Sequence, residues 1–220
     1  MTVEARAEKS WVHARGFLSI ESARVMAIVN ATPDSFADGG QLWQGDGPDL
    51  ERVILRCRQA VAEGASILDV GGESTRPGAR PVDPVQEAAR VVPIVAALAR
   101  DPELAEVPVS IDTRRASVAH LALEQGACIV NDISGLADPQ MLAVVAAHGA
   151  GLVLGHLRGV PQTMQLEIGF SDLLAEVGGE LAARVERACQ HGLTRAHILA
   201  DPGIGFGKTA EQSAALVGCA

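Results

Sequence analysis

The sequence predicts an α/β fold of the (β/α)8 barrel type, and two patterns carry this prediction. Short apolar runs alternate with amphipathic segments that end in glycine, and this unit recurs from Val25 onward. Uninterrupted apolar runs are typical of strands that a parallel sheet buries on both faces. Polar residues follow each run, and a barrel gathers all strand ends around one mouth, whereas an open doubly wound sheet gathers ligands only at its switch point. The barrel is therefore favoured, with the open sheet as the alternative.

Six strands and their helices can be placed from these patterns. We expect strands at residues 25–30, 65–70, 107–112, 127–131, 152–154 and 196–201. We expect helices at residues 49–63, 83–100, 115–125, 138–149 and 171–191, with a last helix beginning at Thr209. The polar residues at the strand ends are Asn30, Asp69, Asp112, Asn131, His156 and Asp201. A barrel needs eight units, so we expect the last two β/α units to be absent and the barrel to be truncated.

Local start and stop signals support these helices. Asp83 is a plausible N-cap, and Asp138 with Pro139 reads as a cap followed by a first-turn proline. Gly64 is expected in the left-handed position after its helix. Pro93 lies inside the second helix and is expected to kink it.

The segment before the first strand, residues 1–23, is expected to form a small hairpin. Residues 16–20 (GFLSI) have strand character, and such a hairpin would plug the N-terminal end of the barrel. No linker or low-complexity tract divides the chain, so residues 1–220 are expected to form a single domain.

Composition excludes several classes of function. Eighteen basic and twenty-seven acidic residues give a formal charge of -9, which argues against binding to nucleic acid or to an anionic membrane. No run approaches the roughly 20 apolar residues that cross a bilayer, and residues 1–10 contain no apolar leader segment. The four cysteines form no C-x-x-C pair and are expected to be buried thiols of a cytoplasmic protein.

Two loops after the first strands carry candidate functional residues. Residues 30–40 (NATPDSFADGG) predict a turn-rich loop at a catalytic mouth, or simply a long connector. Residues 71–78 (GGESTRPG) place Ser74, Thr75 and Arg76 beside two glycines. Hydroxyls and a forked cation are groups that hold a phosphate, although an isolated loop arginine is usually just solvated.

Asp112, Asn131 and Asp201 are the strongest physical signal. Their side chains are expected to converge at strand ends, where they offer acceptors and one donor without a cation nearby in sequence. Such a set suits a ligand with a guanidine-like edge, such as a 2-amino-4-oxo pyrimidine. The alternative for each single residue is a cap on the following helix.

Residues 201–209 (DPGIGFGKT) resemble two nucleotide-binding motifs and match neither. Pro202 stands where a Walker A loop requires glycine, and the glycine spacing differs from the dinucleotide fingerprint. A glycine-rich loop with Phe206 at the mouth and Lys208 nearby still fits an aromatic or anionic substrate. His156 is a candidate base or metal ligand, with a structural hydrogen-bonding role as the alternative; a nucleophile triad is not recognisable from spacing.

Together these stretches resemble dihydropteroate synthase, a family of pterin-binding enzymes. The resemblance is carried by five motifs in order: 28–40 (IVNATPDSFADGG), 69–79 (DVGGESTRPGA), 110–113 (SIDT), 129–135 (IVNDISG) and 201–208 (DPGIGFGK). It implies a barrel that condenses 6-hydroxymethyl-7,8-dihydropterin pyrophosphate with p-aminobenzoate in folate biosynthesis, with Mg²⁺ as cofactor. It also implies a homodimer for the full-length protein and a site where sulfonamides compete.

The resemblance assigns roles to residues by position. Pterin would be held by Asp112, Asn131 and Asp201. Asn30 would bind Mg²⁺ and pyrophosphate, with Thr75 and Arg76 beside the pyrophosphate. The p-aminobenzoate site would be bordered by Phe36, Pro77, Gly205 and Phe206.

Two departures from the family pattern affect what is expected. Gly155-His156-Leu157 stands where members often carry Met-His-Met. The seventh-strand lysine motif and the final-strand Arg-x-His motif are absent, so this chain is expected to be inactive or impaired. A methyltetrahydrofolate-dependent methyltransferase and a noncatalytic pterin-binding remnant remain alternatives.

Overall fold

The computed structural model describes residues 9–32, 43–44, 47–75, 78–166 and 168–219. A parallel sheet of six strands forms its centre, in the order β10-β9-β8-β7-β6-β3. These strands are β3 Val25–Asn30, β6 Ala65–Gly71, β7 Val109–Asp112, β8 Ile129–Asp132, β9 Gly151–Gly155 and β10 Ile198–Asp201. Each strand lies beside the next one of the sheet along the chain, as in a barrel and unlike a doubly wound sheet.

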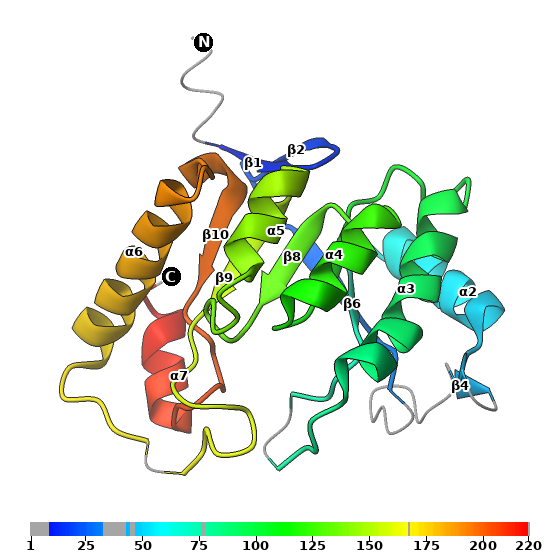
Figure 1. The fold of residues 1–220 in the computed structure, drawn as a ribbon. Helices are drawn as coiled ribbons and strands as arrows, with labels where there is room; N and C mark the ends of the chain where they lie inside the picture. The colour runs from blue at the N-terminus through cyan, green and yellow to red at the C-terminus, as the bar shows by residue number, and fades with distance from the viewer. Residues whose placement is uncertain (1–8, 33–42, 45–46, 76–77, 167, 220) are drawn as a thin grey trace, which may run out of the picture.

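A helix follows each strand of this sheet. The helices are α2 Leu50–Ala62, α3 Pro84–Arg100, α4 Ala116–Glu124, α5 Met141–His148, α6 Leu173–Gln190 and α7 Ala210–Val217. Helices α2 to α6 stand side by side over one face of the sheet in the order of their strands (Figure 1). The prediction of six β/α units of a barrel is therefore confirmed. A two-stranded ribbon of β4 Trp43–Gln44 and β5 Gly47–Pro48 lies between β3 and α2 and was not predicted.

Most predicted helix signals are found in the structure. The Asp83 side chain accepts a hydrogen bond from the Val85 amide, so Asp83 is an N-cap as predicted. Asp49 caps α2 in the same way, by accepting a hydrogen bond from the Arg52 amide, although this cap was not predicted from the sequence. Gly64 has a φ of 112° and Gly149 a φ of 57°, conformations that glycine adopts without steric cost.

Asp138 differs from its predicted role. Helix α5 begins at Met141 rather than beside Pro139, and Gln140 is its N-cap. One Asp138 carboxylate oxygen accepts a hydrogen bond from the Gln140 amide at 2.9 Å, and the other accepts one from the Ala116 amide at 2.8 Å. Asp138 therefore satisfies the first amide of the neighbouring helix α4, a contact across 22 residues that no local signal reveals.

The pleat of the strands separates two kinds of environment. Outward positions such as Leu68, Val70 and Ile111 are fully buried under the helices. Inward positions near the start of β6 and β8 are apolar, as at Ile67 and Ile129, and those nearer the ends of these two strands are polar, as at Asp69 and Asn131. Because successive side chains alternate faces, this arrangement gives the sheet an apolar inner floor and a polar rim.

The N-terminal hairpin covers that floor, as predicted. Strands β1 Ser10–His13 and β2 Gly16–Ser19 pair in antiparallel fashion. Trp11 is 1% exposed and packs with Ile67, Cys128 and Ile129, while its ring N–H donates to the His197 carbonyl at 2.9 Å. The hairpin lies at the opposite end of the molecule from α7 (Figure 1), which leaves the carboxyl ends of the strands open for a site.

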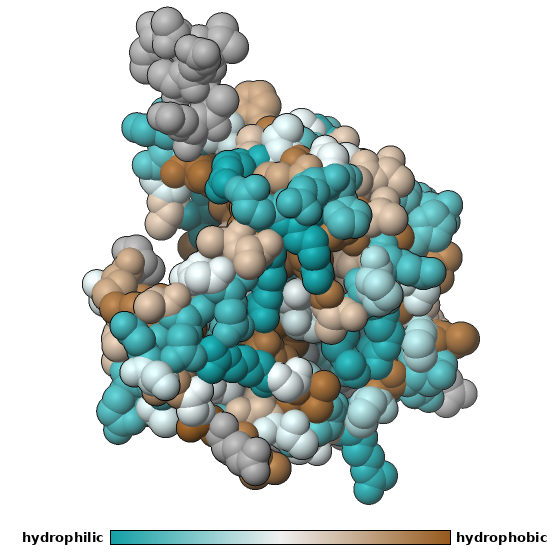
Figure 2. Space-filling view, turned by 60° about the vertical axis from the view of Figure 1, so that its left-hand side comes forward, coloured by the Kyte–Doolittle hydropathy of each residue, from teal (hydrophilic) through white to brown (hydrophobic). Residues whose placement is uncertain are grey.

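The outer surface is mixed in character. With the α6 side turned forward, hydrophilic residues dominate the visible face and apolar residues are scattered among them (Figure 2). In the part of the chain that the structure describes, no helix is long and apolar enough to cross a membrane. Cys57 and Cys128 are buried as predicted, whereas Cys189 is partly buried and Cys219 is exposed.

Candidate functional site

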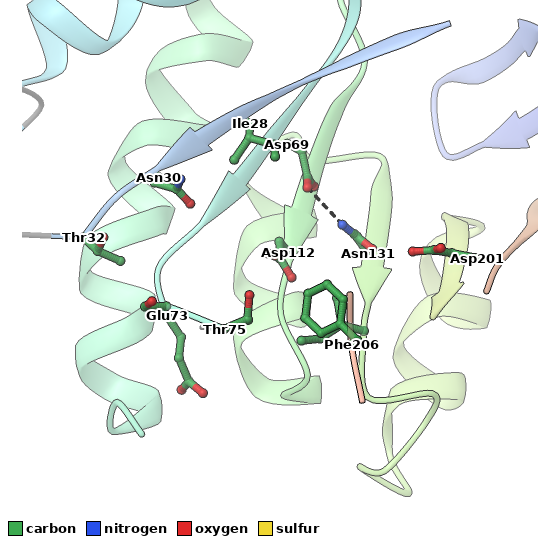
Figure 3. A pocket seen from close by; sticks show the side chains of 12 residues that line it. Ile28, Asn30, Thr32, Asp69, Glu73, Thr75, Asp112, Asn131, Asp201 and Phe206 are labelled. Atoms are coloured by element: carbon green, nitrogen blue, oxygen red, sulfur yellow. Dashed lines mark hydrogen bonds between the residues drawn. The ribbon is translucent and has the colours of Figure 1, made fainter. Parts of the chain in front are cut away.

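A cavity of about 260 Å³ opens at the carboxyl ends of the strands. Its walls are formed by Ile28, Asn30, Thr32, Asp69, Glu73, Ser74, Thr75, Asp112, Asn131, Ile133, Asp201 and Phe206. These residues come from β3, β6, β7, β8 and β10 and from the loops that follow, and they surround one space (Figure 3). The structure thus brings together six of the predicted site residues: Asn30, Thr75, Asp112, Asn131, Asp201 and Phe206.

The register of the sheet sets the neighbours in this cavity. Asp112 on β7 is the partner of Asn131 on β8. The Asn131 amide nitrogen donates to Asp69 Oδ2 at 2.9 Å, the contact drawn in Figure 3. This bond fixes one amide hydrogen of Asn131 and leaves the other hydrogen and the carbonyl oxygen as groups for a ligand.

The carboxyl groups of Asp69 and Asp112 lie in an environment that disfavours charge. Withdrawal from water raises the pKa of Asp69, although the hydrogen bond from Asn131 acts against the rise. Withdrawal from water and then the Asp69 charge raise the pKa of Asp112 well above its usual value. Asp69 Oδ1 and the Ser110 hydroxyl are buried without hydrogen bonds to the described residues, so a ligand that brings N–H donors would relieve an electrostatic cost.

The loop between β6 and α3 is tied down at its base by an ionic network. Glu73 accepts from Arg114 Nε and Nη2, at 3.1 and 2.9 Å, and from the Val82 amide at 3.1 Å. Arg115 forms ion pairs with Glu73 and Glu87 and donates to the Val82 carbonyl. The network links both ends of the loop that carries Ser74 and Thr75 and fixes where their hydroxyls stand at the cavity wall.

Burial and ion pairing act in opposite directions on Glu73. Burial works to raise the pKa of Glu73, but its bonds to Arg115, Val82 and Arg114 outweigh this effect and hold the pKa below its usual value. Glu73 therefore stays ionised at neutral pH and serves to hold the two arginines.

The glycine-rich loop after β10 supplies the aromatic wall. Gly203, Gly205 and Gly207 have φ values of 69°, 79° and 61°, in the left-handed region that favours glycine. Phe206 lines the cavity, while Gly205 is exposed and its carbonyl accepts from the Gln165 side chain at 2.8 Å. Asp201 Oδ1 accepts from the Gly203 amide at 2.8 Å and holds the start of the loop.

His156 and Lys208 do not line this cavity. The His156 side chain is buried, with Nε2 3.1 Å from Glu180 Oε2 and Nδ1 3.1 Å from Lys208 Nζ. Lys208 is 3% exposed, and its ammonium points beneath the loop instead of toward a substrate. These contacts favour the structural role for His156, and they engage the Lys208 amine with buried acceptors away from the cavity.

Three predicted residues, Phe36, Arg76 and Pro77, lie outside the described residues. Conversely, Asp69 and Glu73 were not assigned roles from the sequence. Asp69 carried a signal, since it lies near the carboxyl end of its strand, where Asp112 also lies on β7. Glu73 carried none, because its importance depends on Arg114 and Arg115 more than forty residues away.

Comparison with known proteins identifies the family of this chain. The family model described as "Pterin binding enzyme" matches residues 26–218. The chain belongs to the pterin-binding enzyme family. Among curated members, it is 46% identical over 194 residues to the dihydropteroate synthase of a Synechocystis species, covering 88% of this chain and 64% of that protein.

Solved structures of the family give the same result. The Yersinia pestis dihydropteroate synthase, in complex with a sulfonamide drug, superposes with a TM-score of 0.86 at 35% identity, covering 95% of this chain and 73% of that one. The Burkholderia cenocepacia enzyme, complexed with 7,8-dihydropteroate, has a TM-score of 0.77 at 39% identity, covering 91% of this chain and 65% of that one. The chain thus spans slightly less than two thirds of the Synechocystis protein and of the Burkholderia chain.

Proposed function

We propose that this chain carries the substrate site of a dihydropteroate synthase, which joins 6-hydroxymethyl-7,8-dihydropterin pyrophosphate to p-aminobenzoate. The observation that carries the proposal is the convergence of Asp69, Asp112, Asn131 and Asp201 on one cavity beside Phe206. A pterin presents a ring N–H and an amino group on one edge. Carboxylate and amide oxygens without a cation in the cavity wall suit those donors.

The reaction needs little chemistry from protein side chains. The bond between the pterin methylene carbon and the pyrophosphate oxygen breaks, and its electron pair leaves with pyrophosphate. The amine nitrogen of p-aminobenzoate forms the new bond to that carbon and then loses a proton. The site is left with three tasks: it holds the two substrates in line, excludes water and stabilises the charge on the departing pyrophosphate.

The departing pyrophosphate is assigned to the side of the cavity that carries Asn30 and Thr75. The Thr75 hydroxyl would donate to a phosphate oxygen, and Arg76 on the same loop would add a forked cation. Mg²⁺ takes oxygen ligands and keeps several waters, so a single protein ligand fits when phosphates supply others. Asn30 suits that role, whereas the Glu73 oxygens are occupied by Arg114, Arg115 and the Val82 amide. When bound, Mg²⁺ would offset the charge that develops on pyrophosphate.

The second substrate is assigned to the outer part of the cavity. Phe206 would contact the ring of p-aminobenzoate, with Gly205 shaping the loop, and Phe36 and Pro77 would border the same ring. A sulfonamide carries a similar aniline ring, so it is expected to compete here. A homodimer for a full-length form remains a prediction from the resemblance, and a cytoplasmic location remains a prediction from the cysteines and composition of the sequence.

Calorimetry with variants of two pterin-site residues tests the proposal. Asp112→Ala and Asp201→Ala should each weaken binding of 6-hydroxymethylpterin by about tenfold or more, because each removes charge-assisted hydrogen bonds worth about 1.5–3 kcal/mol. Asp172→Ala is the matched control, since Asp172 caps α6 outside the cavity.

The outcomes separate the possible functions. Equal affinity in the wild-type chain and in either site variant would refute the pterin assignment. Pterin binding together with formation of dihydropteroate from the two substrates would establish the synthase. Pterin binding without turnover would favour a noncatalytic role for this chain.

A further inference from the structure

Lys208 makes an unusual set of contacts for a lysine. Its Nζ lies 3.1 Å from the His156 carbonyl oxygen, 2.9 Å from the Phe206 carbonyl oxygen and 3.1 Å from His156 Nδ1. An ammonium group has three N–H donors, and these three acceptors engage all of them. The side chain therefore joins the loop that carries Phe206 to the residue that follows β9.

Three other side chains bond to the loop backbone. Asp201 accepts a hydrogen bond from the Gly203 amide, Ser213 accepts one from the Gly205 amide, and Gln165 donates one to the Gly205 carbonyl. Three of its residues are glycines with positive φ, and glycine loses more conformational entropy on ordering than any other residue. A Cβ added at Gly203 would stand 2.1 Å from the His156 carbonyl oxygen, so the loop backbone nests directly against His156. A loop of this kind keeps one conformation only if side chains anchor it.

The anchor is rigid because His156 is itself fixed. Since the ammonium of Lys208 donates to Nδ1, the ring carries its proton on Nε2 and donates it to Glu180. Arg158 and Arg184 bind Glu180 from two sides. Burial, followed by the charges of Lys208 and Arg184, lowers the pKa of His156, which agrees with a neutral ring.

We propose that Lys208 is a positioning residue, whose ammonium holds the Gly203–Gly207 backbone against His156 so that Phe206 forms the wall for p-aminobenzoate. This inference rests on the proposed function for the identity of the ligand, but the tether exists without any ligand. Loss of the tether should affect ligand binding on the Phe206 side of the cavity only. Asp112 and Asn131 stand on strands β7 and β8 and do not depend on the loop.

Two variants of Lys208 and one control test the tether. Lys208→Met keeps an unbranched side chain of similar length and removes all three donors. Lys208→Gln keeps two donors on a shorter side chain, so it should have an intermediate effect, and it serves alone if the methionine variant does not fold. Lys9→Met is the matched control, because Lys9 is exposed and is the other lysine of the chain.

Hydrogen exchange on the ligand-free proteins gives the first measurement. Amides of residues 203–207 should exchange at least about tenfold faster in Lys208→Met than in the wild-type and Lys9→Met proteins. Amides of β7 and β8 should be unchanged. Exchange of residues 203–207 at the wild-type rate would overturn the tether, whether or not the chain binds substrates.

Binding gives the second measurement. Affinity for 6-hydroxymethylpterin titrated alone should change by less than about threefold in the Lys208 variants, whereas affinity for p-aminobenzoate titrated into the pterin-saturated protein should fall by at least about tenfold. A general structural defect would lower both affinities together, and that result would overturn the positioning role. If the wild-type chain binds neither compound, the proposed function fails. The hydrogen-exchange experiment still tests the Lys208 tether in that case, because it is done on ligand-free protein.

Discussion

Asp112 shows how a residue proposed to bind a substrate can act against stability. It faces the cavity on β7, and the lining contains no cationic side chain among the described residues. Its pKa is raised by withdrawal from water and by Asp69. A raised pKa in the folded protein means that ionising Asp112 lowers the free energy of unfolding. This loss is absent below pH about 4, where the carboxyl group is protonated in both the folded and the unfolded chain. It grows as the pH rises toward the pKa of the folded state.

Replacing this carboxylate by its neutral isostere should therefore stabilise the ligand-free protein. We expect Asp112→Asn to raise the Tm at pH 7.5 by several degrees and to have little effect near pH 4, as measured by calorimetry in a pH series. A gain of about 1 kcal/mol corresponds to about 2–4 °C in a chain of this size. The same variant should lose pterin affinity.

Asp101 provides a control with the opposite sign. Its carboxylate accepts from Arg58 at 2.6 Å and from the Glu103 amide at 3.1 Å. The Arg58 hydrogen bond lowers the pKa of Asp101 despite some loss of hydration. Asp101→Asn should therefore lower the Tm at pH 7.5, and a rise in both variants would show that the electrostatic account of Asp112 is wrong.

At the scale of elements, the loop between β6 and α3 depends on charges supplied by the segment after β7. Glu87 is 1% exposed, and it binds the Thr113 hydroxyl at 2.7 Å as well as Arg115. Burial is the main cause of the raised pKa of Glu87. Removing Arg115 would leave both Glu73 and Glu87 without their shared cation.

We expect Arg115→Gln to destabilise the protein by about 3–5 kcal/mol, because removing one partner of a buried ion pair strands the other charge. Arg114→Gln should cost about 1 kcal/mol or less, since Arg114 is more exposed and its one ion pair among the described residues is with Glu73. Denaturant unfolding of both variants measures the difference. Equal losses would mean that the network does not centre on Arg115.

At the scale of the whole molecule, the described sheet has two edges, β3 and β10. Ile28 is 72% exposed and Val25 is 59% exposed, both on β3. Unpaired backbone groups beside exposed aliphatic residues form a template for pairing with another chain. The aliphatic side chains and the open edge together favour self-association of this 220-residue chain.

A charge placed on that edge should oppose self-association. We expect the wild-type chain to form larger species as its concentration rises through the micromolar range, and Ile28→Lys to shift this behaviour to at least about tenfold higher concentration. Leu121→Lys is the matched control, because Leu121 is 42% exposed on helix α4, which packs between α3 and α5 over the middle of the sheet. Sedimentation velocity distinguishes them, and an equal effect of both lysines would point to net charge rather than to the edge.

The sequence by itself determined the order of elements and most of the cavity wall. The apolar runs, the cap at Asp83 and the glycines after the helices act within a few residues, so they can be recognised without tertiary contacts. Parallel strands that end in Asn30, Asp112, Asn131 and Asp201 bring those side chains to one rim, because the carboxyl ends of a barrel's strands share one mouth.

Only the tertiary structure decided which polar groups face the cavity and which hold it in shape. The Asp138 carboxylate accepts a hydrogen bond from the first amide of helix α4, and Asp69 orients the Asn131 amide. Glu73 forms ion pairs with Arg114 and Arg115. The Lys208 side chain lies beneath its own loop and contacts His156. Each of these contacts joins residues far apart in the chain, and each is set by the requirement that buried charges and N–H groups find partners. That requirement is met by whichever group lies near in space, which spacing along the sequence does not specify.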